Sequence, residues 1–165
     1  MRGNCPQSAL SIHTDNLIFG ESKNPHKNER SCGGSSGGDA GLIASKCIPF
    51  AIGTDIGGSL RYPAAFCGIY GFKPTTSRIS SLGLSKCRSN KFSAFNHLSG
   101  VIGPMGKSVD DLIVGMKVQL DGEIHKFDPL TAPSPFKQHE FDQVSTDPKK
   151  IKIGILNESS LIPVS

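Results

Sequence analysis

The chain is poor in several features that mark particular protein classes. Hydrophobic residues make up 36% and charged residues 19% of its 165 residues, below the shares of about 45–50% and about 25% that are usual in globular domains. No run of 18 apolar residues occurs, so the sequence predicts no membrane-spanning helix. The N-terminal stretch, Met1–Pro6, is not apolar in the way of a signal peptide. Together these features exclude a coiled coil, a collagen and a transmembrane bundle.

Charge of one sign is not concentrated anywhere in the sequence. Eighteen Lys and Arg against fourteen Asp and Glu give a formal net charge of +4. No block of like charge reaches five residues, whereas a groove for nucleic acid gathers its basic residues on one face. We therefore expect an ordinarily solvated surface and no nucleic-acid partner.

The cysteines lack the spacing of a metal site or of a disulfide framework. They are odd in number and widely spaced, and no Cys-x-x-Cys pair occurs. We expect reduced thiols in a cytoplasmic setting, some of them buried, with no metal and no cofactor. The five cysteines are Cys5, Cys32, Cys47, Cys67 and Cys87.

Glycine, by contrast, is in excess. The chain has 19 glycines, where average usage would place about 12. Ten of them lie between Gly33 and Gly71, which indicates a backbone device in that region. Around it, short apolar runs alternate with helix-forming segments, so we expect an α/β fold with a mixed sheet and flanking helices.

Local signals predict where most elements lie. Helices are expected over 37–46, 60–67 and 112–120, the last with a capping-box-like start at Ser108-Val-Asp-Asp111. Strands are expected over 48–53, 68–73 and 151–156, of which the first reads as a buried strand. The polar or Pro-, Ser- and Gly-rich stretches 1–32, 75–107 and 121–150 are predicted to be mainly irregular.

The segment Gly33-Gly-Ser-Ser-Gly-Gly38 is open to three interpretations. A flexible linker is one, but the segment runs directly into a predicted helix and a buried strand. A phosphate cradle is another, but neither the P-loop ending nor the Gly-x-Gly-x-x-Gly pattern is present. A catalytic serine loop is the third, because glycines let the backbone approach a substrate and a helix start offers free N–H donors.

A second segment, Thr54-Asp-Ile-Gly-Gly-Ser59, favours the catalytic interpretation. Its serine lies 24 residues after Ser35, between an apolar strand and a predicted helix, as in turns that expose a nucleophile. The backbone N–H groups of this turn are placed to converge on one point, as in the oxyanion hole of an acyl-transfer enzyme. They are those of Ile56, Gly57, Gly58 and Ser59.

Gly33–Gly38 and the run Gly53–Pro74 together closely resemble the amidase signature family, and within it the animal fatty-acid amide hydrolases. The subgroup is also indicated by Pro6-Gln-Ser8, by Phe19-Gly20 with Asn24-Pro25, and by Asp128-Pro129 with Pro133-Ser-Pro-Phe136. The resemblance extends over nearly the whole chain.

This resemblance implies a Ser-Ser-Lys triad that hydrolyses amides through an acyl-enzyme. Ser59 matches the family's nucleophile, Ser35 matches the bridging serine that relays a proton, and Ile56–Ser59 match the oxyanion hole. A serine hydroxyl needs a base at neutral pH, and a lysine can serve once its pKa of about 10.4 is lowered.

Four further positions match the family in other ways. Ala9 falls where relatives have a residue lining the substrate pocket, although its residue type differs. Ser36, Asp55 and Arg61 match positions that are structural in the family, next to the reacting groups.

The family's basic lysine belongs to a motif well upstream of the serine loop. Lys23 and Lys27 stand in a polar loop without that context, so a surface role is expected for both. The five histidines lie in polar segments and do not favour a Ser-His-Asp triad. We therefore expect residues 1–165 to be a central part of an amidase domain, without the lysine segment and the downstream part.

Three hypotheses follow for function. The first is a fatty-acid amide hydrolase segment acting on N-acylethanolamines and primary fatty amides, homodimeric in the full-length enzyme. The second is another member of the family, such as the glutamine-hydrolysing component of a tRNA amidotransferase. The third is a catalytically dead truncated copy. A cytoplasmic location is expected, peripheral on an intracellular membrane in the full-length protein, although no membrane attachment is encoded in these residues.

Overall fold

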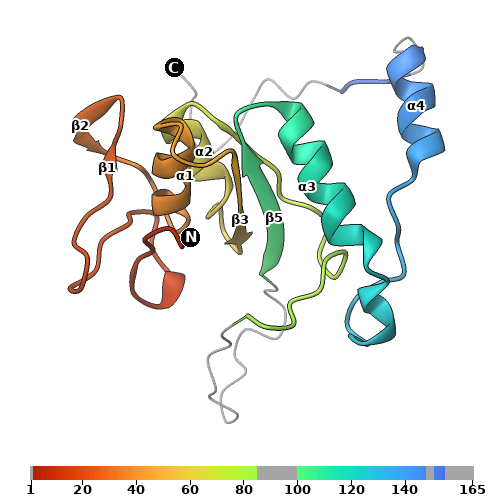
Figure 1. Ribbon diagram of the computed structural model, residues 1–165, viewed down its shortest axis with the longest axis horizontal. Coiled ribbons are helices and arrows are strands. Elements are labelled where there is room, and N and C mark those ends of the chain that lie inside the picture. The colour runs from red at the N-terminus through yellow and green to blue at the C-terminus, as the bar shows by residue number, and fades with distance from the viewer. Residues whose placement is uncertain (1, 85–99, 148–150, 155–165) are drawn as a thin grey trace.

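The computed structural model describes residues 2–84, 100–147 and 151–154 (Figure 1). The elements, in chain order, are the 3-10 helix η1 (Gln7–Ala9), strands β1 (Lys23–Asn24) and β2 (Lys27–Ser31), helix α1 (Gly37–Ala44), strand β3 (Phe50–Asp55), helix α2 (Arg61–Cys67), strands β4 (Tyr70–Gly71) and β5 (Val101–Gly106), helix α3 (Val109–Asp121), 3-10 helix η2 (Ile124–Lys126) and helix α4 (Gln138–Thr146).

The main sheet has three antiparallel strands in the order β3-β5-β4. Strand β5 lies in the middle and is buried along its whole length. It pairs with β3 from Val101 opposite Asp55 to Gly106 opposite Phe50. Figure 1 shows α1 and α2 on one side of this sheet and α3 on the other. The predicted α/β class with flanking helices is confirmed.

The core lies between α1, α2 and the sheet, and most of its side chains are small. Small side chains allow the two helices and β5 to approach closely, which matters for the loops that connect them. Its buried members are Cys32, Ala40, Ile43, Ala44, Leu60, Ala64, Cys67, Ile69 and Met105.

All three predicted helices are confirmed. Helix α2 ends at Gly68, whose φ of 64° is the left-handed conformation in which glycine commonly ends helices. Helix α3 begins with a complete capping box. The Ser108 hydroxyl accepts from the Asp111 N–H at 3.1 Å, and the Asp111 carboxylate accepts from the Ser108 N–H at 2.9 Å.

Several predictions about strands and loops were wrong. Residues 101–106 form the central strand β5, because burial of Val101, Ile102 and Met105 outweighs the Gly and Pro between them. The predicted buried strand 48–53 is β3, shifted to Phe50–Asp55, and its position at the sheet edge leaves the Phe50 and Ile52 side chains 42% and 50% exposed.

Other segments also differ from the predictions. The N-terminal part contains the hairpin β1–β2, and the predicted connection 121–150 contains η2 and α4. The strand predicted over 68–73 shortens to Tyr70–Gly71. Residues 151–154 form no strand, since no described strand lies beside them to pair with, and 155–156 lie outside the described residues.

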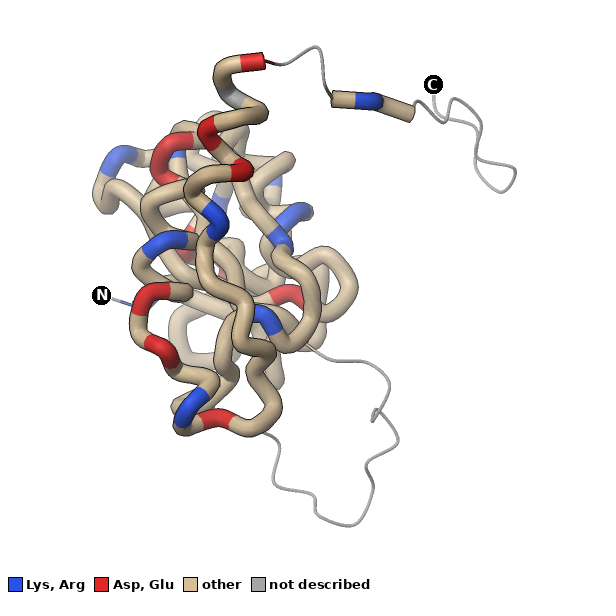
Figure 2. The backbone as a smooth tube through the Cα atoms, turned by 90° about the vertical axis from the view of Figure 1, so that its right-hand side faces the viewer, with Lys and Arg blue, Asp and Glu red and all other residues tan. Residues whose placement is uncertain are grey.

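The cysteines and charges are distributed much as the sequence suggested. Cys32 and Cys67 are buried free thiols and Cys5 and Cys47 are exposed ones, whereas Cys87 lies outside the described residues. Figure 2 shows Lys and Arg interspersed with Asp and Glu along the described chain.

The capping box leads to the first prediction. Ser108→Ala removes the acceptor for the Asp111 N–H, so the free energy of unfolding should fall by about 1 kcal/mol. Urea titration followed by circular dichroism measures this change. Thr76→Ala, an exposed loop position, is the control and should change the value by less than about 0.5 kcal/mol. An unchanged midpoint for Ser108→Ala would show that the cap contributes nothing.

Candidate active site

The turn between β3 and α2 is built around the buried carboxylate of Asp55, which is the last residue of the strand and 0% exposed. Its oxygens accept hydrogen bonds from the backbone N–H groups of Gly58, at 2.7 Å, and of Leu60, at 3.1 Å. The Arg61 guanidinium adds two bonds of 3.0 Å, in a bidentate pair. Four donors therefore hold the residues on both sides of Ser59 in place.

The electrostatics of this carboxylate agree with its hydrogen bonds. Burial on its own raises the pKa of Asp55, but hydrogen bonds from Arg61 and from the N–H groups of Leu60 and Gly58 outweigh burial and hold the pKa below its ordinary value. Asp55 is therefore ionised at neutral pH and acts as a fixed anion. The family-based expectation that Asp55 and Arg61 are structural fits this geometry.

Gly58 shows why the turn needs a glycine. Its φ is 130°, and a Cβ at this position would lie 2.2 Å from the Tyr62 ring. Only glycine satisfies both constraints. The turn places Ser59, which is partly buried, between the end of the strand and the start of α2.

The serine loop, residues 32–38, precedes α1 and is buried. The Ser35 and Ser36 side chains are only 2% and 5% exposed, and the peptide bond between Gly34 and Ser35 is cis. Thr14, which is fully buried, donates its hydroxyl to the Gly33 carbonyl at 2.8 Å and accepts from the Gly37 N–H at 3.2 Å. The role of Thr14 was not predicted, because a single Thr in a polar stretch of sequence gives no signal.

The two serine segments meet in the structure. The Ser36 N–H donates to the Ser59 carbonyl at 3.2 Å, so the serine loop lies directly beside the β3–α2 turn. A Cβ at Gly53 would be 2.6 Å from the Ser36 hydroxyl, which shows how closely the loop approaches the strand. Ser35, Ser36 and Ser59, 24 residues apart at most in sequence, are thereby brought together.

The backbone donors of the turn do not all remain available. Asp55 already engages the Gly58 N–H, so this group differs from the other three of the expected oxyanion hole. Among the described residues, no hydrogen bond is made by the N–H groups of Ile56, Gly57 or Ser59. These three donors are the ones left to bind an oxyanion.

The N-terminal segment reaches the serine loop through residues 11–13. A Cβ at Gly34 would lie 2.6 Å from the Ser11 carbonyl and 2.9 Å from the His13 N–H. Ala9, two residues before this contact, is exposed in η1. The structure thus places the segment, and not Ala9 itself, against the loop.

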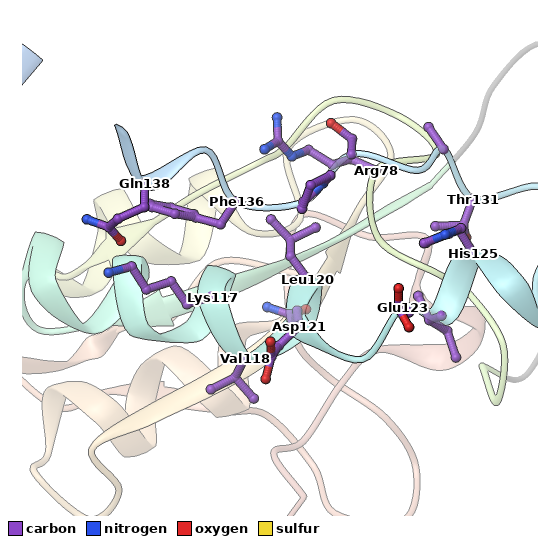
Figure 3. Close-up of a pocket in the computed structure, with 15 residues that line it drawn as sticks. Arg78, Lys117, Val118, Leu120, Asp121, Glu123, His125, Thr131, Phe136 and Gln138 are labelled. Atoms are coloured by element: carbon purple, nitrogen blue, oxygen red, sulfur yellow. The ribbon is translucent and has the colours of Figure 1, made fainter. Parts of the chain in front are cut away.

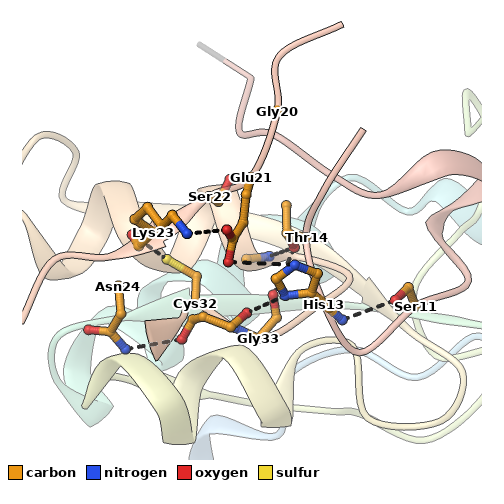
Figure 4. A network of polar contacts seen from close by, with 12 residues as sticks. Ser11, His13, Thr14, Gly20, Glu21, Ser22, Lys23, Asn24, Cys32 and Gly33 are labelled. Atoms are coloured by element: carbon orange, nitrogen blue, oxygen red, sulfur yellow. Dashed lines mark hydrogen bonds and ion pairs between the residues drawn. The ribbon is translucent and has the colours of Figure 1, made fainter. Parts of the chain in front are cut away.

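No described lysine amine makes a hydrogen bond or ion pair with Ser35 or Ser59. Lys23 pairs instead with Glu21 (Figure 4), and Lys27 is exposed on β2. His13 bonds the Ser31 hydroxyl through Nδ1 at 2.8 Å, and its Nε2 lies 3.6 Å from Glu21. His13 is therefore a partnered, half-buried residue that supports the segment before the serine loop.

The described residues form neither a metal centre nor a membrane span. Within the described ranges, no group of three or more His, Cys, Asp or Glu side chains is placed to hold a metal ion. No helix in the described part of the chain is long and apolar enough to cross a membrane.

The Asp55 cluster leads to the second prediction. Asp55→Asn replaces an acceptor oxygen by a donor and removes the charge opposite Arg61, so the free energy of unfolding at pH 7 should fall by about 1.5–3 kcal/mol. Because the folded pKa is depressed, the carboxylate stabilises the fold above its unfolded pKa of about 3.9, and this contribution is lost as pH falls through the folded pKa.

Urea titrations between neutral and acidic pH measure both effects. The asparagine variant should show a flatter loss of stability on acidification than the parent. Asp15→Asn, at an exposed position, is the matched control. Parallel pH profiles for parent and Asp55→Asn would contradict this assignment.

Comparison with known proteins agrees with this geometry. The chain is 38% identical over 158 residues to the vitamin D3 hydroxylase-associated protein of Gallus gallus, covering 96% of this chain and 32% of that protein. It is 39% identical over 153 residues to fatty-acid amide hydrolase 1 of Sus scrofa, covering 92% and 25%. It is 37% identical over 152 residues to an acetamidase of Emericella nidulans, covering 92% and 26%.

Solved structures show the same likeness. A fatty acid amide hydrolase superposes with a TM-score of 0.73 at 35% identity, covering 81% of this chain and 23% of that one. A bacterial aryl acylamidase of the amidase signature family gives 0.68 at 34% identity, covering 83% and 26%. The chain thus spans about a third or less of these relatives. Because the Amidase family model matches residues 1–165, the chain belongs to the amidase family, the group of hydrolases that act on amide C–N bonds.

Proposed function

We propose that this chain carries the nucleophile and the proton relay of a serine amidase that hydrolyses fatty-acid amides, namely N-acylethanolamines and primary fatty amides. The observation that supports it best is the hydrogen bond from the Ser36 N–H to the Ser59 carbonyl. That bond seats the Ser35 loop beside the turn that presents Ser59.

In the proposed reaction, the Ser59 hydroxyl oxygen attacks the amide carbonyl carbon and its proton passes to Ser35. Ser35 in turn gives its own proton to the base, which the family resemblance assigns to a lysine outside the described serine site. The N–H groups of Ile56, Gly57 and Ser59 bind the oxyanion. The C–N bond then breaks, the amine leaves with a proton returned through Ser35, and water hydrolyses the acyl ester to the acid.

Exposed apolar side chains next to the serine loop support a fatty acyl substrate. The N-terminal segment contacts Gly34 at residues 11–13, and its apolar side chains are strongly exposed. Such a patch is unusual unless it contacts another apolar group. Its members, with their exposed fractions, are Leu10 (74%), Ile12 (67%), Leu17 (102%), Ile18 (82%) and Phe19 (77%).

The alternatives are another amidase of the family, such as the glutamine-hydrolysing component of a tRNA amidotransferase, and a catalytically dead truncated copy. The names of relatives do not choose among substrates, since the acetamidase is 37% identical and a glutamyl-tRNA(Gln) amidotransferase component of Sulfurihydrogenibium sp. is 38% identical. Release of ammonia from glutamine in preference to a long-chain amide would favour the amidotransferase alternative.

Partner and location proposals follow from this function. The substrate is a small lipid amide, and the full-length enzyme forms a homodimer in the cytoplasm, peripheral on an intracellular membrane. No nucleic-acid partner is proposed.

The third prediction identifies the nucleophile. In a protein extended upstream to include the lysine, a fluorophosphonate should label the parent and not Ser59→Ala, because only Ser59 is acylated. Labelling is read by mass spectrometry of the modified peptide. Ser81→Ala, in the loop after β4, should label like the parent. Equal labelling of Ser59→Ala would show that another residue is the nucleophile.

The fourth prediction separates the two adjacent buried serines. Ser35→Ala should lower the rate of amide hydrolysis by a factor of about 10²–10⁴, the usual contribution of a positioned acid–base group. Ser36→Ala is the matched variant and should cost less, because its side chain packs against Gly53. A loss at Ser36 as large as that at Ser35 would exchange their roles.

The fifth prediction concerns residues 1–165 alone, which should not turn over a long-chain amide. No described lysine touches Ser35 or Ser59, so the nucleophile lacks its base. Amine release is measured after circular dichroism has established that the chain is folded. Turnover of about 1–10³ per second, abolished by Ser59→Ala, would mean that a base lies within these residues, and Lys23, Lys27 and Lys73 would be tested first.

A further inference from the structure

A cavity of about 530 Å³ lies on the side of the sheet away from the serine site (Figure 3). Its walls come from the last turns of α3, from η2 and from the segment 131–138, and Arg78 reaches it from the loop after β4. Volumes of this size are typical of small-molecule sites. Since α3 and the sheet stand between this cavity and Ser59 (Figure 1), it is a separate site.

Two polar atoms in the cavity wall are buried without a partner. They are the Arg78 Nε, a hydrogen-bond donor, and the Gln119 Oε1, an acceptor, and neither has a hydrogen bond within the described part of the chain. The Gln119 amide nitrogen is already used, since it donates to the Gly115 carbonyl at 3.0 Å. Native proteins pair the great majority of such buried groups, so a donor and an acceptor facing one cavity indicate a ligand that matches both.

An apolar compartment adjoins this polar pair. A second cavity of about 270 Å³ shares Arg78 and Phe136 with the first. Its other walls are mostly apolar and include Leu112, Ile113 and Met116 of α3. A ligand held at Arg78 can therefore place a hydrocarbon chain against α3.

The wall opposite α3 is held in place by a buried carboxylate. Asp128, which is 4% exposed, accepts from the Ser80 hydroxyl at 2.5 Å, the Thr131 hydroxyl at 2.9 Å and the Leu130 N–H at 3.0 Å. The Ala132 N–H also donates to the Ser77 carbonyl at 2.7 Å. These bonds tie the segment that lines the cavity to the loop that carries Arg78, so the site is formed in advance of binding.

We propose that this site binds an aliphatic primary carboxamide. The carbonyl oxygen of such a ligand accepts from Arg78 Nε, its NH₂ donates to Gln119 Oε1, and its chain lies in the apolar compartment beside Met116. A carboxylate satisfies only Arg78 and sets a second acceptor against the Gln119 oxygen, so the amide is preferred over the acid. The site binds and does not hydrolyse, and it goes beyond the function proposed for Ser59.

The test is a titration of the full chain with hexanamide and with hexanoate, followed by backbone amide NMR. The Ser59→Ala variant is used, so that turnover plays no part and the result does not depend on the proposed hydrolysis. Hexanamide should cause saturable shifts at Leu120, Ile124 and Thr131, with a lower dissociation constant than hexanoate.

Variants then locate the binding groups. Arg78→Met and Gln119→Met should each weaken hexanamide binding by about threefold to tenfold, the effect of one lost hydrogen bond. Arg30→Met and Gln143→Met, at exposed positions on β2 and α4, are matched controls and should bind like the parent. Should Arg78→Met not fold, as judged from its spectrum, Gln119→Met carries the test.

Three results would overturn the proposal. They are no saturable shift with hexanamide, hexanoate binding as tightly as hexanamide, or unchanged affinity in the folded methionine variants. The first would mean that solvent alone fills the cavity. The second would mean that the ligand class is wrong. The third would mean that binding occurs elsewhere.

Discussion

The arrangement of the candidate active site depends on one buried anion. Asp55 has no solvent to stabilise its charge, and it is stabilised instead by two backbone N–H groups and a bidentate guanidinium. A buried carboxylate is favourable only when it is paired and fully hydrogen-bonded. The backbone from Gly58 to Arg61 must therefore wrap around it, and Ser59 lies inside that wrap.

The second constraint is close approach. The serine loop can reach β3 only because Gly53 has no side chain, and helices α1 and α2 can pack tightly because the residues between them are mostly small. Thr14 then closes the loop from the other side with two hydrogen bonds. The result is that Ser35 is buried but adjacent to the turn bearing Ser59, as a proton relay requires.

The other side of the sheet has a parallel construction of its own. Asp128, like Asp55, is a buried carboxylate that collects donors from residues distant in sequence, here Ser80 and Thr131. The difference lies in what each one positions. Asp55 shapes a turn with free N–H groups, whereas Asp128 fixes the wall of a cavity in which Arg78 and Gln119 keep unpaired polar atoms.

Short-range information in the sequence was enough for three features of this protein. Helices α1, α2 and α3 follow from local composition and from the capping box at Ser108, whose bonds all lie within three residues. The residues of the candidate site, Ser35 and Ser59 above all, were identified by their resemblance to the amidases, and family membership is confirmed while their individual roles stay predictions. Long-range contacts were not visible in the same way. Strand β5 resembles a loop in sequence because Gly103 and Pro104 are weak strand formers, and it is a strand because it is buried between β3 and β4. The bond between Ser36 and Ser59, the engagement of the Gly58 N–H by Asp55 and the cavity at Arg78 all join residues through the packed core, where burial and geometry, not local preference, set the free energy.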